Sequence, residues 1–226
     1  MGIYIFFTAS FFLLAYYFFR KERMNHCDSI NQCKKLSSLN QQLAEQNQSL
    51  REQNQQLITE THNMRFLAQH DSLSGLYNRG SAQAIIEERL LLLQEVSNQK
   101  YALLLIDLDH FKSINDTLGH NIGDCAIREL GRVLKNFTRS SDISARIGGD
   151  EFCLWLGNLP SASTASSIAE RLVNAVQEIQ LHNLHLTISV GIAIAEEGDT
   201  YETLVERADQ ALYHVKSNGR NSFHAL

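Results

Sequence analysis

The stretch 25–68 limits the possible fold most, because it contains neither proline nor glycine and carries leucine or methionine at every seventh position. These positions, taken as d of a heptad, are Leu36, Leu43, Leu50, Leu57 and Met64. An apolar repeat of seven residues over this length is typical of a left-handed coiled coil. We therefore predict that 25–68 is one long helix, the stem, which pairs with a second copy of the chain.

The a positions of the stem are mostly polar, and they are Cys33, Asn40, Asn47, Asn54 and Thr61. Asparagine at a weakens the seam, yet it favours a parallel, in-register dimer because each amide pairs with the equivalent amide of the other helix. A solvated, glutamine-rich helix that does not pair is the alternative.

Residues 2–19 carry no charge and include six phenylalanines. As a helix at ~1.5 Å per residue they would extend about 27 Å, close to the thickness of the hydrocarbon core of a bilayer. Arg20, Lys21 and Arg23 follow at once, so the positive-inside rule places everything after Arg20 in the cytoplasm. We expect 1–20 to be a single-pass membrane anchor. The alternative, a cleaved signal peptide, needs a basic leading region and a cleavage motif, which these residues lack.

The composition excludes some classes of function. With 20 basic and 25 acidic residues the formal net charge is −5, which argues against a nucleic-acid surface. A bound phosphate must therefore meet local lysines, backbone amides or metal ions. The four cysteines form no CxxC pair, and we expect them to be reduced, as in a cytosolic domain.

The pattern from His70 onward predicts one α/β domain with helices packed on a mixed sheet. The continuous apolar run 101–106 predicts a central strand buried on both faces. Runs 143–147 and 151–156 predict a hairpin with a glycine turn. The other expected elements are helices at 79–99, 111–115, 125–137, 162–180 and 201–215, and strands at 185–194 and at the C-terminus.

The hairpin turn reads Gly148-Gly149-Asp150-Glu151-Phe152. Glycines permit positive φ and let the backbone approach a ligand, and two carboxylates follow at once. Backbone amides beside carboxylates suit a magnesium–triphosphate, because Mg²⁺ takes one or two carboxylates plus phosphate oxygens. Taken alone, a Gly-Gly hairpin is more often just a turn.

Asp107 and Asp109 follow the buried run, where open α/β sheets place ligands. We expect Asp107 to pair with Asp150 across the hairpin and the two to hold metal ions that activate a hydroxyl and neutralise a leaving pyrophosphate. The alternative is that Asp107 and Asp109 cap the next helix.

Two further groups of polar residues flank these carboxylates. The first, suited to a guanine edge or alternatively to loops and caps, is Asn115, Asp116, Gly119, His120, Gly123 and Asp124. The second, after the last helix, is Lys216 and Arg220, which would meet a terminal phosphate or stabilise the C-terminus of that helix.

Together these motifs resemble the GGDEF-domain diguanylate cyclases, and the resemblance covers 70–223. The opening Asp71-Ser72-Leu73-Ser74-Gly75-Leu76-Tyr77-Asn78-Arg79 is similar to the family's start motif, with Ser74 for the usual threonine and Gly80 for a second arginine. The resemblance implies a five-stranded sheet surrounded by helices, similar to adenylyl cyclase and polymerase palm domains. It divides the chain into the anchor 1–20, the stem 25–68 and a catalytic domain 69–226.

The resemblance also implies an activity, the condensation of two GTP into cyclic di-GMP and two pyrophosphates. Two Mg²⁺ ions per half-site, with Mn²⁺ as an alternative, would be held by Asp107, the Leu108 carbonyl, Asp150 and Glu151. Asp150 would accept the proton of the attacking 3′-hydroxyl with Glu151 beside it, and Lys112 would stabilise the transition state. Substrate binding would fall to Asn115 and Asp124 for guanine, His120 in the same loop, Gly148 and Gly149 in the turn, and Lys216 and Arg220 for the terminal phosphates.

Each domain of this family binds one GTP, so two must meet face to face, and pairing of the stem, favoured by membrane tethering, would bring the half-sites together as a homodimer. Arg139 and Asp142 stand at the spacing of the family's inhibitory product site and would bind cyclic di-GMP, although a surface ion pair is the alternative. The expected location is the bacterial inner membrane. Rival interpretations are a non-catalytic cyclic di-GMP receptor, a cyclase for another dinucleotide and an inactive dimerisation module.

Overall fold

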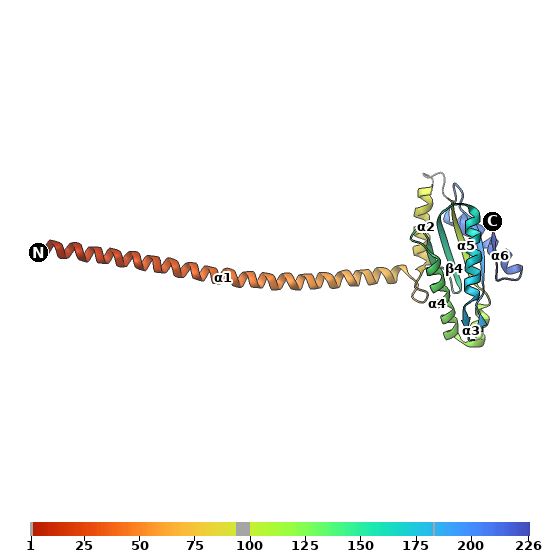
Figure 1. The fold of residues 1–226 in the computed structure, drawn as a ribbon, viewed down its shortest axis with the longest axis horizontal. Coiled ribbons are helices and arrows are strands. Elements are labelled where there is room, and N and C mark those ends of the chain that lie inside the picture. Colours follow the sequence, from red (N-terminus) through yellow and green to blue (C-terminus); the bar gives the residue numbers. More distant parts are fainter. Residues whose placement is uncertain (1, 94–99, 183) are drawn as a thin grey trace. The chain divides into compact units, whose positions relative to one another are not determined.

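The computed structural model of the protein describes residues 2–93, 100–182 and 184–226, and for 2–12, 92 and 93 the backbone only (Figure 1). The chain divides into two compact units, Met1–Asn63 and Met64–Leu226. The predicted helix 79–99 is observed as α2, Arg79–Leu93, and its remaining residues 94–99 lie outside the described ones.

The first unit consists of helix α1, Gly2–Gln69, which continues into the second unit. The absence of proline and glycine after Gly2 explains this length, so the predicted stem helix is confirmed. In the single chain the d-position leucines of the stem are 47–59% exposed. No described residue of the chain buries these leucines, and the pairing of the stem with a second copy stays a prediction.

The predicted anchor at 1–20 gains no support from the structure. In the part of the chain whose side chains are described, no helix offers an apolar stretch long enough to cross a bilayer. The side chains of residues 1–12, which make up most of the anchor, lie outside that part. The membrane anchor stays a prediction from the sequence.

The second unit contains a six-stranded mixed sheet in the order β1-β3-β4-β2-β7-β8. The strands are β1 (Tyr77–Asn78), β2 (Lys100–Leu108), β3 (Ile143–Arg146), β4 (Glu151–Leu159), β7 (Ile188–Ile194) and β8 (Phe223–Ala225). Central β2 is antiparallel to β4 and β7, while β1 runs parallel to β3 and β8 parallel to β7.

The expected number of five strands is wrong. The sheet has six, and β1 is the strand that was not predicted from the sequence. It has two residues, too few for alternation to show in the sequence, and it forms because Tyr77 and Asn78 pair with Ala145 and Arg146 at the edge of the sheet. The predicted strand 185–194 is also shorter than expected. Its beginning belongs to a separate two-stranded ribbon of β5 (Gln180–Leu181) and β6 (Leu184–His185).

Helices cover both faces of the sheet. The remaining helices are α3 (Phe111–Leu118), α4 (His120–Phe137), α5 (Ala162–Gln177) and α6 (Tyr201–Ser217). Leu104 and Ile106 of β2 pack in one core with α4 and α5, whereas Leu103 and Leu105 pack in a second core with α2 and α6. The alternation of a strand sends successive side chains to opposite faces, so the prediction that β2 is buried on both sides is confirmed.

Candidate active site

Central strand β2 ends beside the Gly-Gly turn, and this brings the predicted metal carboxylates together. Asp107 pairs in register with Glu151 of β4, and the Leu108 amide donates to the Asp150 carbonyl at 3.1 Å. The charge of Asp150 is close enough to Asp107 to raise the pKa of Asp107. The expected neighbourhood of Asp107 and Asp150 is therefore observed, while their roles toward a metal stay a prediction.

Asp107 forms an ion pair with Lys216, whose Nζ lies 2.7 Å from Asp107 Oδ2. The pKa of Asp107 is nevertheless raised, because burial outweighs the hydrogen bond and charge of Lys216 and because Asp150 and Asp109 repel the negative charge. The single ammonium group of Lys216 therefore does not neutralise the negative charge of the carboxylates at this end of β2. Uncompensated negative charge on an oxygen ligand is a suitable setting for a divalent cation.

The described residues contain no group of three or more His, Cys, Asp or Glu side chains placed to hold a metal ion. Magnesium does not require one, since it is usually bound by one or two carboxylates together with substrate phosphates and water. Asp107 and Asp150 supply that minimum, with Glu151 next to them. The residues present therefore fit a magnesium ion that arrives with a nucleoside triphosphate.

The Gly148-Gly149 pair provides space around the turn, without the positive φ that glycine permits. Neither glycine has positive φ. A Cβ on Gly148 would lie 2.5 Å from Glu151 Oε2, whereas a Cβ on Gly149 would meet nothing within 4 Å. Gly148 thus leaves room for the Glu151 carboxylate, and Gly149 leaves the tip of the turn open to a ligand.

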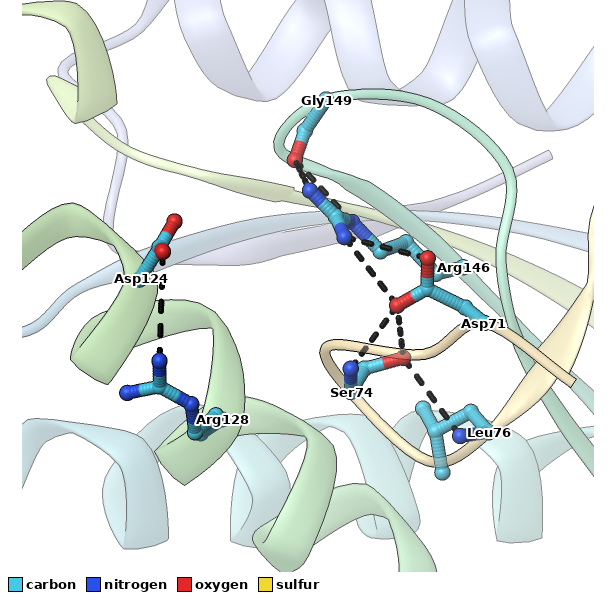
Figure 2. Close-up of polar contacts among 7 residues, drawn as sticks. All are labelled: Asp71, Ser74, Leu76, Asp124, Arg128, Arg146 and Gly149. Atoms are coloured by element: carbon cyan, nitrogen blue, oxygen red, sulfur yellow. Dashed lines mark hydrogen bonds and ion pairs between the residues drawn. The ribbon is translucent and has the colours of Figure 1, made fainter. Parts of the chain in front are cut away.

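Arg146 fastens this turn to the start motif (Figure 2). Its Nη2 donates to the Gly149 carbonyl at 2.7 Å, and its Nη1 donates to Asp71 Oδ1 at 3.0 Å. Asp71 Oδ1 also accepts hydrogen bonds from the amide and hydroxyl of Ser74, at 2.8 and 2.7 Å. The sequence analysis missed Arg146, and its position before the turn was the available signal.

The pKa of Asp71 is lowered in the fold. Burial alone would raise it, but the hydrogen bonds from Ser74 and the hydrogen bond and charge of Arg146 together outweigh burial. The charged form is thus preferred in the folded state, so this carboxylate contributes to the free energy of unfolding at neutral pH.

The predicted guanine-reading residues gather where α3 meets α4. A Cβ on Gly123 would overlap Asn115 Oδ1, so the Asn115 side chain lies against α4 at Gly123, the residue before Asp124 in the sequence. Asp124 is half-exposed and its Oδ2 lies 3.8 Å from Arg128 Nη2 (Figure 2). Gly119, with φ 86°, separates the helices, and α4 begins at His120, five residues before the predicted start at Cys125.

Three predicted residues occupy exposed positions near these groups. Lys112 lies in the first turn of α3, His120 is the first residue of α4, and Arg220 follows α6 with φ 63°. Exposed side chains of this kind are available to a ligand.

The proposed inhibitory pair is separate from these residues. Arg139 and Asp142 precede β3, whereas the Gly-Gly turn follows it. Asp142 accepts from the Arg139 amide at 2.9 Å and from the Gly157 amide at 3.1 Å, so its carboxylate is built into the loop. Both residues line a surface cavity of about 280 Å³ that Arg171 of α5 also lines. The sequence analysis missed Arg171, since only the packing of α5 brings it there.

The fold and these residues define a mixed α/β domain with acidic residues at the end of its central strand. A family model described as "Diguanylate cyclase, GGDEF domain" matches residues 68–222. The chain therefore belongs to the GGDEF-domain family.

Known relatives are similar to this domain. Diguanylate cyclase A of Treponema denticola is 42% identical over 125 residues, which are 53% of this chain and 33% of that protein. Diguanylate cyclase DgcM of Escherichia coli K12 is 39% identical over 155 residues, or 68% of this chain and 37% of that protein. The chain thus spans about a third of the length of these relatives.

Solved structures match as well. The coiled coil and GGDEF domain of DgcB from Caulobacter crescentus, in complex with c-di-GMP, superposes with a TM-score of 0.74 at 28% identity, covering 84% of this chain and all (100%) of that one. Diguanylate cyclase SiaD of Pseudomonas aeruginosa, in complex with its activator SiaC, has a TM-score of 0.67 at 28% identity, with 92% and 88% covered. The first of these neighbours contains a coiled coil together with its GGDEF domain, the combination predicted for this chain.

The Asp71–Arg146 pair makes a testable contribution to stability. Its effect is fully present above the pKa of Asp71 in the unfolded chain, which is near the ordinary aspartate value of 3.8, and is lost as the pH falls through the lowered pKa of the folded state. We expect Asp71→Asn to lower the free energy of unfolding by about 1 kcal/mol at pH 7, allowing for partial exposure of both side chains. Urea unfolding followed by the fluorescence of the single tryptophan, Trp155, measures this.

The matched control is Asp124→Asn, which removes the carboxylate of the more exposed and longer ion pair. That change is expected to cost less than about 0.5 kcal/mol. A deficit of Asp71→Asn that stays constant from pH 7 to pH 3 would contradict the assignment.

Proposed function

We propose that this protein is a diguanylate cyclase. The observation that carries the proposal is the arrangement at the end of β2, where Asp107 is joined to Lys216 at 2.7 Å beside an intact Asp150-Glu151 turn. In the proposed reaction the 3′-hydroxyl of each GTP attacks the α-phosphorus of the other. Each attack forms one phosphodiester bond, breaks one bond between the α- and β-phosphates and releases pyrophosphate.

Different residues of the chain bind the metal ions, accept the proton and stabilise the transition state in this reaction. Asp107 and Asp150, with the Leu108 carbonyl and Glu151, would hold two Mg²⁺ or Mn²⁺ ions, which neutralise the triphosphate and activate the attacking hydroxyl when bound. Asp150 accepts the proton of the 3′-hydroxyl. Lys112 stabilises the negative charge that develops on the phosphoryl group.

Binding of the substrate rests on three places in the domain. Asn115 and Asp124 present an amide and a carboxylate on the neighbouring helices α3 and α4, and these groups match the acceptor and donors on the edge of guanine, with His120 in the same loop. Gly148 and Gly149 leave the turn open to the phosphates. Lys216 and Arg220 supply positive charge for the terminal phosphates.

The proposal includes a homodimer, because a domain that holds one GTP offers only half of the reacting pair. What supports it is the exposed leucine stripe of the stem, which a second copy in parallel would cover. The proposal also keeps a location at the cytoplasmic membrane, supported by the uncharged run 2–19 and the basic residues Arg20, Lys21 and Arg23.

A second candidate function is a receptor for cyclic di-GMP. It is favoured by the cavity that Arg139, Asp142 and Arg171 line, in a family with neighbours solved in complex with c-di-GMP. In an active cyclase the same cavity would serve feedback inhibition by the product.

Measuring the turnover of GTP distinguishes a cyclase from a receptor for cyclic di-GMP. Purified protein incubated with GTP and Mg²⁺ is expected to release cyclic di-GMP and pyrophosphate, resolved by chromatography and mass, while Asp150→Ala yields neither. An absence of product, together with cyclic di-GMP binding that Arg139→Ala abolishes, would make the chain a receptor.

The metal assignment has a readout that does not need turnover. Because burial raises the pKa of Asp107, its charge costs folding free energy, and Asp107→Asn is expected to melt at the same temperature as the parent or higher without metal. Mg²⁺ with GTP should raise the melting temperature of the parent but not that of the variant. Equal stabilisation of both proteins would exclude Asp107 as a ligand.

The stem makes its own prediction. Leu43→Glu together with Leu50→Glu is expected to lower the turnover per protomer at least tenfold at low protein concentration, because buried charge at d opposes pairing. The control is Gln42→Glu with Ser49→Glu, which adds the same charge one residue away from the stripe. Unchanged specific activity across dilution, with the Leu43 and Leu50 variant equal to its control, would show that the stem does not pair the half-sites.

A further inference from the structure

Asp109 is a buried carboxylate to which neither the sequence analysis nor the proposed reaction gives a role beyond a possible helix cap. It is 3% exposed at the start of the connection from β2 to α3. The helix-cap interpretation is wrong, since α3 is preceded by His110 in the left-handed region and has no side-chain cap. Burying a carboxylate is costly, so its partners must compensate it.

The two oxygens of Asp109 have different partners, both neutral. Oδ1 accepts from the Ser189 hydroxyl of β7 at 2.7 Å, and Oδ2 accepts from the Asn221 backbone amide at 3.0 Å. Ser189 is itself completely buried. Asp109 therefore ties the loop after α6 to the interior of the sheet.

That loop has an unfavourable backbone. Three consecutive residues lie at positive φ, namely Gly219 at 107°, Arg220 at 63° and Asn221 at 45°. Positive φ costs free energy for residues other than glycine and persists only where surrounding contacts hold it. The Asn221 side chain does not provide such a contact through its oxygen, because Oδ1 is buried without a hydrogen-bond partner among the described atoms.

The contacts that do hold the loop come from both of its sides. The Arg220 amide donates to the Val215 carbonyl at 3.1 Å, and the Val190 amide donates to the Ser222 carbonyl at 2.9 Å. Between these two backbone hydrogen bonds, the Asn221 amide donates to the side-chain carboxylate of Asp109. Arg220 thus lies in a turn of unfavourable backbone conformation, and Asp109 holds the residue that follows it.

Asp107 in β2 and Asp109 in the connection from β2 to α3 therefore contact the two ends of one basic segment, residues 216–221. Asp107 meets the side chain of Lys216 at the first end, and Asp109 meets the backbone of Asn221 at the other. Lys216 and Arg220 are the cations proposed for the terminal phosphates. The segment that carries both cations is therefore held by two carboxylates that lie two residues apart in the sequence.

From this geometry we propose that Asp109 is a positioning residue, which sets the backbone of the 219–221 turn so that the Arg220 guanidinium reaches the terminal phosphates of GTP. The inference rests on the proposed function. Asp109 then raises the affinity of the site for a triphosphate without contacting the substrate.

The test is a coupling experiment between Asp109 and Arg220. Asp109→Asn keeps the shape of the side chain, but its amide nitrogen cannot accept a hydrogen bond, so one of the two donors loses its partner. We expect it to raise the KM for GTP, and the dissociation constant of GTP measured by calorimetry, about tenfold with kcat within about twofold. In an Arg220→Ala background the same change should raise neither value further.

Two more variants make the outcome decisive. Ser189→Ala removes the other partner of Asp109 and should raise the KM by a smaller factor, again only when Arg220 is present, which keeps the test usable if Asp109→Asn does not fold. Asp199→Asn is the matched control, because Asp199 likewise accepts from a backbone amide, that of Glu196, and forms an ion pair with Arg207, but stands before the opposite end of α6. It should lower the melting temperature without changing the KM.

Independent effects of Asp109→Asn and Arg220→Ala, which multiply in the double variant, would overturn the proposal, as would an Asp109→Asn protein with the parent's affinity. A parent that binds GTP without turnover would overturn the proposed activity alone, because the coupling is still read from the dissociation constants. A parent that binds no GTP would overturn both.

Discussion

The burial of β2 between two layers of helices governs the rest of this domain. Leu103 and Leu105 fill one core, Leu104 and Ile106 fill the other, and neither face offers a charged side chain access to water until the strand ends. Asp107 is the first residue at which acidic chemistry is possible, and even there burial raises its pKa. The candidate site therefore lies at the end of β2 because the middle of the sheet is closed to it.

The same constraint explains why so much of the fold was predictable. A strand buried on both faces is a continuous apolar run, and helices packed on it show their own period, so β2, the β3–β4 hairpin and the helices could be placed from the sequence. Errors occurred where short-range patterns carry little signal. Strand β1 has two residues, and the start of α4 depends on the φ of Gly119, which no periodicity reports.

The candidate site was predictable in its residue types but not in its connections. Asp107, Asp150 and Asn115 stand in recognisable motifs, whereas Arg146, Arg171 and the true partners of Asp109 depend on which segments pack together. Asp71 and Arg146 are 75 residues apart in the chain, and Asp109 and Asn221 are 112 apart. Contacts over such separations are set by the topology of the sheet, so a single sequence does not reveal them.

Strand β3 has four residues, with the cavity of Arg139 and Asp142 before it and the Gly-Gly turn after it. The two proposed sites share this strand but no side chain. Selection can therefore act on them independently. Under the proposed function, substitutions that remove the acidic turn would leave the residues of the cavity in place, and substitutions in the cavity would leave those of the turn in place.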